Sequence, residues 1–295
     1  MGTIHQPVLL DEVLAWLAPR EGSILVDGTV GGGGHAAALA DRLGETGRVI
    51  GLDRDPSMLE LARAAVAGRP VTLVHAPYAE MRRVLEEMGI DRVQGVLLDL
   101  GLSSDQLAWR ERGFSFAVDG PLDMRFDSGS DDPDAADLVN RLPAEELADL
   151  FYKYGEERYS RRIARRIVEE RRIEPIRTTA RLAEVVRRSL PPPARRGPID
   201  PSTRVFQALR IAVNDELGQV DEVLRIIPDV LAPGGRAAII SFHSLEDRRV
   251  KWAFRSDPRL TVLTRKPVTA TATEVAANPR ARSAKLRVAE RCPNN

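Results

Sequence analysis

The chain of 295 residues contains a single cysteine, Cys292, close to its last residue. One cysteine can form neither an internal disulfide nor a cysteine-based zinc site, so the fold relies on neither. No apolar run approaches the roughly 20 residues that cross a bilayer, and the first residues lack the basic and apolar segments of a signal peptide. We therefore expect a cytoplasmic protein with no membrane partner and no bound metal ion.

An excess of charge of one sign is also missing, because 43 basic residues stand against 43 acidic residues. This balance argues against a general polyanion binder. The charges are nevertheless segregated, since residues 119–137 are rich in aspartate and residues 158–172 contain seven arginines. A local basic face can therefore exist on a chain of zero net charge.

Strand and helix signals alternate in the first hundred residues, which is typical of a parallel sheet built from βαβ units. From about residue 104 to residue 202 the sequence shows only helical segments, proline-rich joints and acidic loops. The expected strands are 24–27, 48–53, 71–75, 93–99, 236–242, 260–264 and 285–290. The expected helices after residue 104 are 144–154, 158–172, 179–190 and a long helical region at 203–231, which a Pro233-Gly234-Gly235 turn follows.

The same alternation predicts how the chain divides into domains. We expect an α/β core made of residues 1–104 and 203–295. A helical domain at residues 105–202 interrupts this core and is expected to recognise the substrate.

A glycine-rich loop follows the first expected strand and runs from Gly28 to His35. Glycine lets the backbone turn tightly and lie against a ligand, and a strand-to-helix junction suits a nucleotide-like cofactor. The loop alone is also compatible with a tight connection that binds nothing. Asp53 ends the second strand and favours an adenosine cofactor, because a carboxylate there accepts hydrogen bonds from ribose hydroxyls.

NAD(P) and S-adenosylmethionine are the two adenosine cofactors to be distinguished. A dinucleotide site presents amides to a pyrophosphate, whereas S-adenosylmethionine carries sulfonium and ammonium groups that acidic side chains favour. Asp27 and Asp99 end the first and fourth strands. Asp27-x-Thr29-x-Gly31-x-Gly33 also follows the methyltransferase pattern D-x-G-x-G-x-G, with Thr29 in place of the first glycine. The sequence therefore predicts S-adenosylmethionine.

Short motifs are spread in order over nearly the whole chain. They are HQPVLLDE at 5–12, GGH at 33–35, DRDP at 53–56, LLDLG at 97–101 with serines at 103 and 104, RGFSF at 112–116, GPLDMR at 120–125, YGEER at 154–158, TRVFQA at 203–208, SFHSLEDR at 241–248 and NPRARS at 278–283. In these motifs the chain resembles the ribosomal RNA small subunit methyltransferase H family, also called MraW, of 16S rRNA cytosine-N4 methyltransferases.

The resemblance implies a class I S-adenosylmethionine methyltransferase core, Rossmann-like and α/β, with an inserted all-helical domain. It implies 16S rRNA within the small ribosomal subunit as the partner, methylated on the N4 amine of a decoding-centre cytidine. It also implies cofactor contacts from Gly33, Gly34, His35, Asp53, Tyr78, Asp99 and Gln106. Tyr78, just after the third strand, can lie beside the adenine, although an ordinary half-buried loop aromatic is the alternative.

Asp99 and His243 are the candidates for the chemistry at the amine. The cytosine N4 is a poor nucleophile, so positioning and hydrogen-bond acceptors should supply most of the acceleration. Asp99 can accept from the amine or from the cofactor ammonium. His243 can orient the base, take the departing proton or cap the next helix. DNA amino-methyltransferases carry prolines and an aromatic residue that are missing after Asp99, which disfavours that class.

Arginine-rich segments are candidates for holding RNA. Arg158, Arg161, Arg162 and Arg165 recur at helical spacing and would present a basic face to phosphates; the alternative is a solvated helix paired with the aspartate-rich loop. Arg280 and Arg282 lie in a second cluster, and Arg125 could clamp a phosphate beside Asp123 or form a structural pair with it. A binding factor without activity stays open, as does the oligomeric state, with a homodimer among the options.

Overall fold

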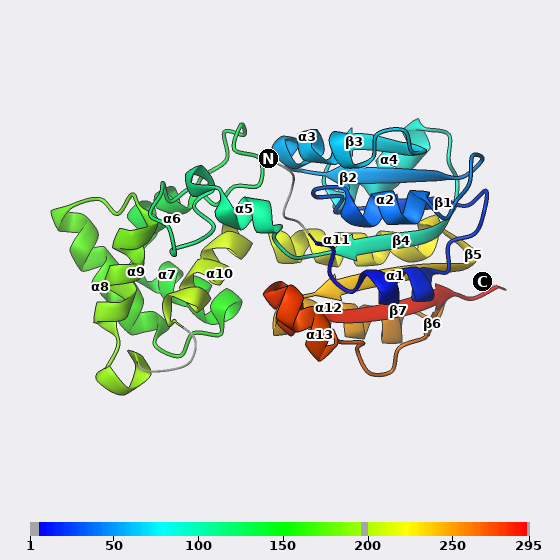
Figure 1. The fold of residues 1–295 in the computed structure, drawn as a ribbon. Helices are drawn as coiled ribbons and strands as arrows, with labels where there is room; N and C mark the ends of the chain where they lie inside the picture. Colours follow the sequence, from blue (N-terminus) through cyan, green and yellow to red (C-terminus); the bar gives the residue numbers. More distant parts are fainter. Residues whose placement is uncertain (1–5, 196–199, 294–295) are drawn as a thin grey trace. The chain divides into compact units, whose positions relative to one another are not determined.

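The computed structural model describes residues 6–195 and 200–293 (Figure 1); His5 of the first motif lies outside them. Its contacts divide the chain into a core unit, Met1–Ser103 with Leu217–Asn295, and a helical unit, Ser104–Glu216. The core unit is α/β and the helical unit is inserted into it as one piece. The predicted fold class, a Rossmann-like α/β core with an inserted helical domain, is confirmed.

The core unit is built on a seven-stranded sheet of described residues in the order β3-β2-β1-β4-β5-β7-β6. Its strands are β1 (Ile24–Asp27), β2 (Arg48–Asp53), β3 (Val71–His75), β4 (Val93–Asp99), β5 (Leu231–Ser241), β6 (Leu260–Val262) and β7 (Lys285–Arg291). The first five are parallel, and β7 is antiparallel to both β5 and β6. The carboxyl ends of β1, β2 and β4 therefore meet at one edge, where ligands bind in open α/β sheets.

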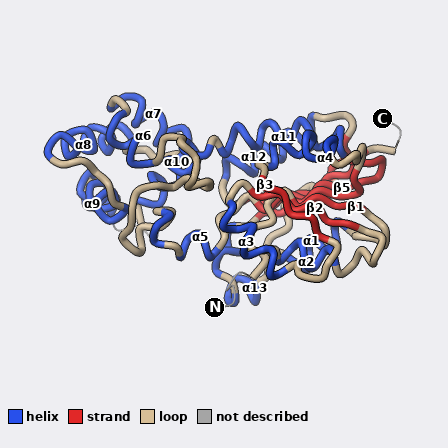
Figure 2. Tube along the Cα trace, turned by 90° about the horizontal axis from the view of Figure 1, so that it is seen from above, coloured by secondary structure: helices blue, strands red, loops and turns tan. Residues whose placement is uncertain are grey.

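Helices cover both faces of this sheet. They are α1 (Leu10–Leu17), α2 (Gly34–Ala40), α3 (Pro56–Ala65), α4 (Met81–Glu87), α11 (Glu216–Val230), α12 (Ser244–Ser256) and α13 (Ala272–Ala277). Figure 2 shows α1, α2 and α3 on one face and α4, α11 and α12 on the other.

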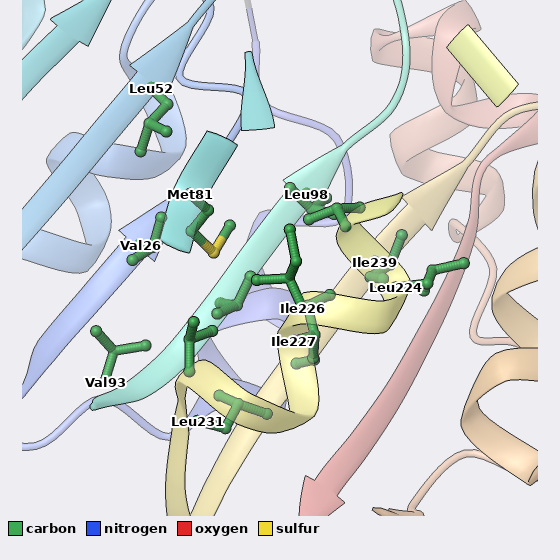
Figure 3. Packing of buried hydrophobic residues seen from close by; sticks show 14 of the residues in the cluster. Val26, Leu52, Met81, Val93, Leu98, Leu224, Ile226, Ile227, Leu231 and Ile239 are labelled. Carbon is green, nitrogen blue, oxygen red and sulfur yellow. The ribbon is translucent and has the colours of Figure 1, made fainter. Parts of the chain in front are cut away.

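Alternate strand residues supply the two cores. Leu97 of β4 belongs to the cluster under α1, α2 and α3, whereas Leu98 belongs to the opposite cluster. In that opposite cluster, Ile226 and Ile227 of α11 pack against the sheet near Leu98 (Figure 3). Burial on both faces explains why the strands read as continuous apolar runs.

The helical unit contains α5 (Ser104–Ala108), α6 (Ala135–Arg141), α7 (Ala144–Gly155), α8 (Ser160–Ile173), α9 (Thr179–Ser189) and α10 (Ser202–Asn214). The helices predicted at 144–154, 158–172 and 179–190 are confirmed as α7, α8 and α9, with small shifts at their ends. Gly155 lets α7 approach α10 closely, because a Cβ there would lie 2.4 Å from the carbonyl oxygen of Arg204.

The predicted helical region at 203–231 is confirmed, but it consists of two helices, α10 and α11. Asp215 adopts the left-handed conformation, with φ of 46°, and separates α10 from α11. The carboxylate of Glu216 accepts two hydrogen bonds of 2.7 Å from the guanidinium of Arg210, which fixes this break. As a result α10 packs with α7 in the helical unit, and the boundary falls after Glu216, later than the predicted residue 202.

The expected turn at residues 233–235 lies within β5. Pairing with β4 jumps from Leu231 opposite Val93 to Arg236 opposite Gly95, so extra β5 residues bulge out between these pairs. Gly234 supports the bulge with a positive φ of 74°.

Candidate functional site

The glycine loop between β1 and α2 needs its glycines for local structure. Gly31 and Gly33 have positive φ values of 51° and 86°, which glycine adopts at little cost. A Cβ at Gly33 would lie 3.1 Å from the Cβ of Ala65 on α3, whereas a Cβ at Gly31 would meet nothing closer than a backbone oxygen at 3.8 Å. The loop is therefore closed against α3 at Gly33 and open at Gly31.

Asp53, at the end of β2, fixes the open part of this loop. Its Oδ2 accepts the amide hydrogen of Gly31 at 2.9 Å, and its Oδ1 accepts that of Asp55 at 2.9 Å. Burial raises the pKa of the Asp53 carboxyl to about 6. A carboxylate has about four lone-pair sites, so Asp53 can accept further hydrogen bonds from a ligand beside the loop.

Asp27, at the end of β1, is a buried carboxylate without a positive partner. Its Oδ1 accepts the amide hydrogen of Thr29 at 3.2 Å, while its Oδ2 has no hydrogen-bond partner among the described residues. Burial, together with the nearby charges of Asp99 and Asp53, raises the pKa of Asp27 to about 7. A buried, unpaired carboxylate is costly unless a cation compensates it, so this arrangement fits a positively charged ligand.

Asp99 and Tyr78 complete the group around the loop. The hydroxyl of Thr29 accepts the amide hydrogen of Asp99 at 2.6 Å, which joins the buried end of β4 to the loop. A Cβ on Gly28 would lie 3.1 Å from the Cβ of Tyr78, so this residue begins directly beside the loop. The structure thus brings together Asp27, Asp53, Asp99 and Tyr78, as the order of strands predicts.

The N-terminal segment fastens the start of α2. A Cβ on Gly34 would lie 2.8 Å from the ring of Pro7, and the buried His35 donates from Nε2 to the carbonyl oxygen of Val8 at 2.9 Å. Burial lowers the pKa of His35, which favours its neutral form. His35 therefore has a structural role on this side of its ring, and the predicted cofactor contacts of Gly34 and His35 stay predictions.

Residues from the far end of the chain hold this same segment. The carboxylate of Glu274 on α13 accepts the amide hydrogen of Leu9 at 2.7 Å. The side-chain amide of Asn278 donates to the carbonyl oxygen of Gln6 at 3.1 Å. Sequence reasoning missed these contacts, which no local pattern signals.

Gln106 and Arg280 lie in different units. Gln106 is a buried residue of α5 in the helical unit, so its predicted contact with the cofactor stays a prediction. Arg280, in the core unit, donates to the carbonyl oxygen of Leu102, and its guanidinium carbon lies 5.9 Å from the centre of the Phe242 ring. Arg280 is therefore held close to the segment that follows β4.

His243 caps α12, which was one of its three predicted roles. Its Nδ1 accepts the amide hydrogen of Glu246 at 3.3 Å, and the carboxylate of Glu246 accepts the amide hydrogen of His243, which completes a capping box. Contact with the substrate stays a prediction for this residue.

Two substitutions separate the capping and proton-accepting roles of His243. Asparagine is a good N-cap and alanine a poor one, so H243A should destabilise the protein by about 1 kcal/mol while H243N should not. If capping is its whole role, H243N also keeps the wild-type rate of methyl transfer. Thermal unfolding and single-turnover kinetics measure the two effects, and a large rate loss in a stable H243N would instead show that His243 acts on the substrate, by orienting the base or by taking its proton.

Arg125 and Arg287, the latter close in sequence to the second arginine cluster, are engaged in structure. Arg125 donates to both carboxylate oxygens of Asp123, at 3.0 and 2.7 Å, so the predicted structural pair is the arrangement observed. Arg287 is likewise paired with Asp247 at 2.6 Å. Arg282 is exposed. Its predicted contact with RNA, like those of Arg125 and Arg280, stays a prediction.

The basic face of α8 is exposed. Arg158, Arg161, Arg162 and Arg165 lie in solvent, while Arg166 is paired with Glu170 of the same helix at 2.6 Å. Within residues 6–195 and 200–293, no ion pair joins these arginines to the aspartate-rich loop, which was the predicted alternative. Among those same residues, no helix is long and apolar enough to cross a membrane, and no cluster of three potential metal ligands occurs.

Comparison with known proteins shows which family the chain is similar to. The model of the MraW methylase family matches residues 2–292. A relative named Ribosomal RNA small subunit methyltransferase H, from Synechococcus sp. (strain JA-3-3Ab), is 51% identical over 97% of this chain and 94% of its own length. Its namesake from Gloeobacter violaceus is 52% identical, over 99% and 89%. A solved rRNA methylase from Streptococcus thermophilus has a TM-score of 0.44 and 12% identity, over 96% and 93%.

Proposed function

We propose, starting from the fact that this chain belongs to the MraW methylase family, that it methylates the exocyclic N4 of a cytidine in the decoding centre of 16S rRNA. Membership of this family makes the chain an S-adenosylmethionine-dependent methyltransferase of ribosomal RNA. The observation that supports the proposal most directly is the group of Asp27, Asp53 and Asp99 around one glycine loop. Since its substrate is ribosomal RNA, we place the enzyme in the cytoplasm.

The loop residues fit S-adenosylmethionine, which supplies a methyl group activated on a sulfonium when it is bound. Asp53 would accept hydrogen bonds from the ribose hydroxyls, using the lone pairs that Gly31 and Asp55 leave free. Asp27, with its unpartnered Oδ2, would compensate the positive charge of the cofactor. Tyr78 would lie beside the adenine. The open side of Gly31 leaves room for a ligand against the backbone.

Asp99 is the residue that we propose to act on the target amine. Its buried carboxylate would accept a hydrogen bond from N4, which favours the pyramidal nitrogen whose lone pair can attack the methyl carbon. As the N–C bond forms and the S–C bond breaks, the nitrogen must lose one proton. Asp99 would receive it directly or pass it to solvent.

The helical unit would bind the RNA substrate. The exposed arginines of α8 are suited to phosphates, and a cytosine must leave its stack before its amine can reach a cofactor. We assign substrate recognition to this unit because Arg161, Arg162 and Arg165 of α8 are exposed and form no ion pair with any described residue.

Transfer of labelled methyl groups tests the proposal. The substrate is the 30S subunit without this modification, and 23S rRNA and duplex DNA are the controls. We expect label only in 16S rRNA, recovered as N4-methylcytidine after nucleoside analysis, and we expect D99A to abolish it. Label in duplex DNA would make the chain a DNA amino-methyltransferase, and cofactor binding without transfer to any of these would make it a binding factor.

A further inference from the structure

The helical unit has a surface hollow of about 590 Å³ where α7 ends and α8 begins. We call it the arginine–tyrosine hollow, and its lining residues are Asp149, Tyr152, Arg158, Tyr159, Ser160, Arg161, Arg162 and Arg165. A neighbouring hollow of about 550 Å³ shares Asp149, Arg161 and Arg165 with it. The second hollow is also lined by Glu145, so the excess of arginines belongs to the arginine–tyrosine hollow.

The charge of the arginine–tyrosine hollow is not compensated from within the protein. In the described parts of the chain, none of its four arginines forms an ion pair, whereas Arg166 on the same helix is paired with Glu169 and Glu170. Asp149 is the one carboxylate in its lining. The hollow therefore has an excess of positive charge and fits a ligand with several negative charges.

Two aromatic rings lie among these arginines. Tyr152 is 67% exposed and Tyr159 is 40% exposed, although large rings are usually buried in a soluble protein. Exposed aromatic rings beside a basic groove are the combination that binds single-stranded nucleic acids, because every base has a face that can stack. Phosphate contacts alone would explain the arginines and leave the tyrosines without a role.

Tyr152 lies in the last part of α7, and the turn between α7 and α8 fixes the backbone that carries Tyr159. Gly155 is pressed against α10, and Glu156 follows in the left-handed conformation with φ of 49°. The buried carboxylate of Glu157 then accepts the amide hydrogen of Tyr159 at 2.7 Å. Because this backbone is fixed, binding a ligand costs little ordering of the protein.

We propose that the arginine–tyrosine hollow binds an unpaired segment of RNA, with its arginines on the phosphates and with Tyr152 and Tyr159 stacked on bases. The choice of RNA rests on the proposed function. In a duplex the base faces are already stacked on each other, so the tyrosines give the hollow a preference for single strands. The enzyme would thereby hold a non-helical stretch of its RNA substrate.

Fluorescence anisotropy with the full chain tests this proposal. The probes are two labelled RNAs of equal charge, an oligouridylate of ten nucleotides and a short duplex. We expect the Y152A/Y159A variant to bind the oligouridylate at least about tenfold more weakly than the wild type, with an unchanged dependence on salt. Its affinity for the duplex should stay within about twofold. The R161A/R165A variant should instead lower the salt slope by about 1.4, because each phosphate contact to a single strand contributes about 0.7.

Matched variants show whether the rings themselves are responsible. Y152F/Y159F keeps both ring faces and should bind the oligouridylate like the wild type. W252A removes an exposed ring from α12 in the core unit, where Trp252 is 66% exposed, and should also have no effect. Wild-type affinity in Y152A/Y159A, an equal loss on the duplex, or an equal loss in Y152F/Y159F would overturn the proposal.

Methyl transfer to 30S subunits, measured in parallel, distinguishes a wrong assignment of the hollow from a wrong proposed function. If N4-methylcytidine forms and the tyrosines do not affect oligouridylate binding, the hollow is wrongly assigned and the function stands. If the tyrosines matter for the oligouridylate but no methylated cytidine forms, the hollow stands as an RNA-binding surface and the function is wrong.

Discussion

Replacing Asp27 with asparagine should stabilise the cofactor-free protein at pH 8 and weaken its binding of S-adenosylmethionine. Asparagine keeps an oxygen for the amide of Thr29 but carries no charge to bury. Since burial raises the pKa of Asp27 from 3.8 to about 7, and each unit corresponds to about 1.4 kcal/mol, the gain is up to about 4 kcal/mol.

The sign of this effect depends on pH. In the unfolded chain Asp27 ionises near pH 4, and in the folded protein it ionises near pH 7. The folded state therefore binds more protons between these values, and the wild type loses stability as the pH rises through them. D27N and the wild type should thus unfold at similar temperatures near pH 4 and at clearly different temperatures at pH 8.

The affinity for the cofactor should rise over the pH range in which the cofactor-free protein loses stability. A cation favours the ionised form of Asp27, so the affinity of the wild type for S-adenosylmethionine should rise between pH 6 and pH 8. D27N should bind at least about tenfold more weakly at pH 8, as expected for a lost hydrogen bond to a charged group. Calorimetry measures both affinities. D91N, which changes a side chain that is 95% exposed, is the matched control and should leave stability and binding unchanged.

Replacing Asp53 with alanine should reduce the affinity for S-adenosylmethionine about a hundredfold or more. Two hydrogen bonds from ribose hydroxyls to a carboxylate contribute roughly 1.5–3 kcal/mol each, and the amide of Gly31 also loses its acceptor. Equilibrium dialysis of the labelled cofactor measures the loss. An unchanged affinity would contradict both the ribose contact and the role of Asp53 in ordering the loop.

The control for this variant is D55A. Asp55 follows Asp53 by two residues and caps α3, where its Oδ1 accepts the amide hydrogen of Ser57 at 3.0 Å. D55A should lower the free energy of unfolding by about 1 kcal/mol and keep the affinity for the cofactor. If D55A loses as much affinity as D53A, general damage to this corner of the core explains both results.

Local patterns predicted the parallel half of the fold well. The first four strands have the predicted bounds, because each is an apolar run between turn residues, and β1 and β2 end in the carboxylates Asp27 and Asp53. Since parallel strands place their carboxyl ends at one edge, the sequence positions of these carboxylates were enough to predict their meeting.

Features that depend on the direction of side chains in three dimensions could not be predicted in this way. The break at Asp215 depends on the contact between Arg210 and Glu216, and a helical pattern runs through it without interruption. The choice between clamp and structural pair for Arg125 depended on the direction of its guanidinium, which sequence does not give. Tyr152 and Tyr159 could be noticed only once the turn between α7 and α8 had placed both rings beside the arginines.

The contacts of Glu274 and Asn278 with the N-terminal segment affect when this part of the enzyme can fold during translation. The glycine loop is translated within the first 35 residues, but the segment that fastens it is held by residues made some 265 and 272 positions later. Such distant contacts form late, because their loop entropy must be overcome first. A nascent chain that stops before residue 274 lacks both contacts, so the N-terminal segment beside the loop is fastened only when translation is nearly complete.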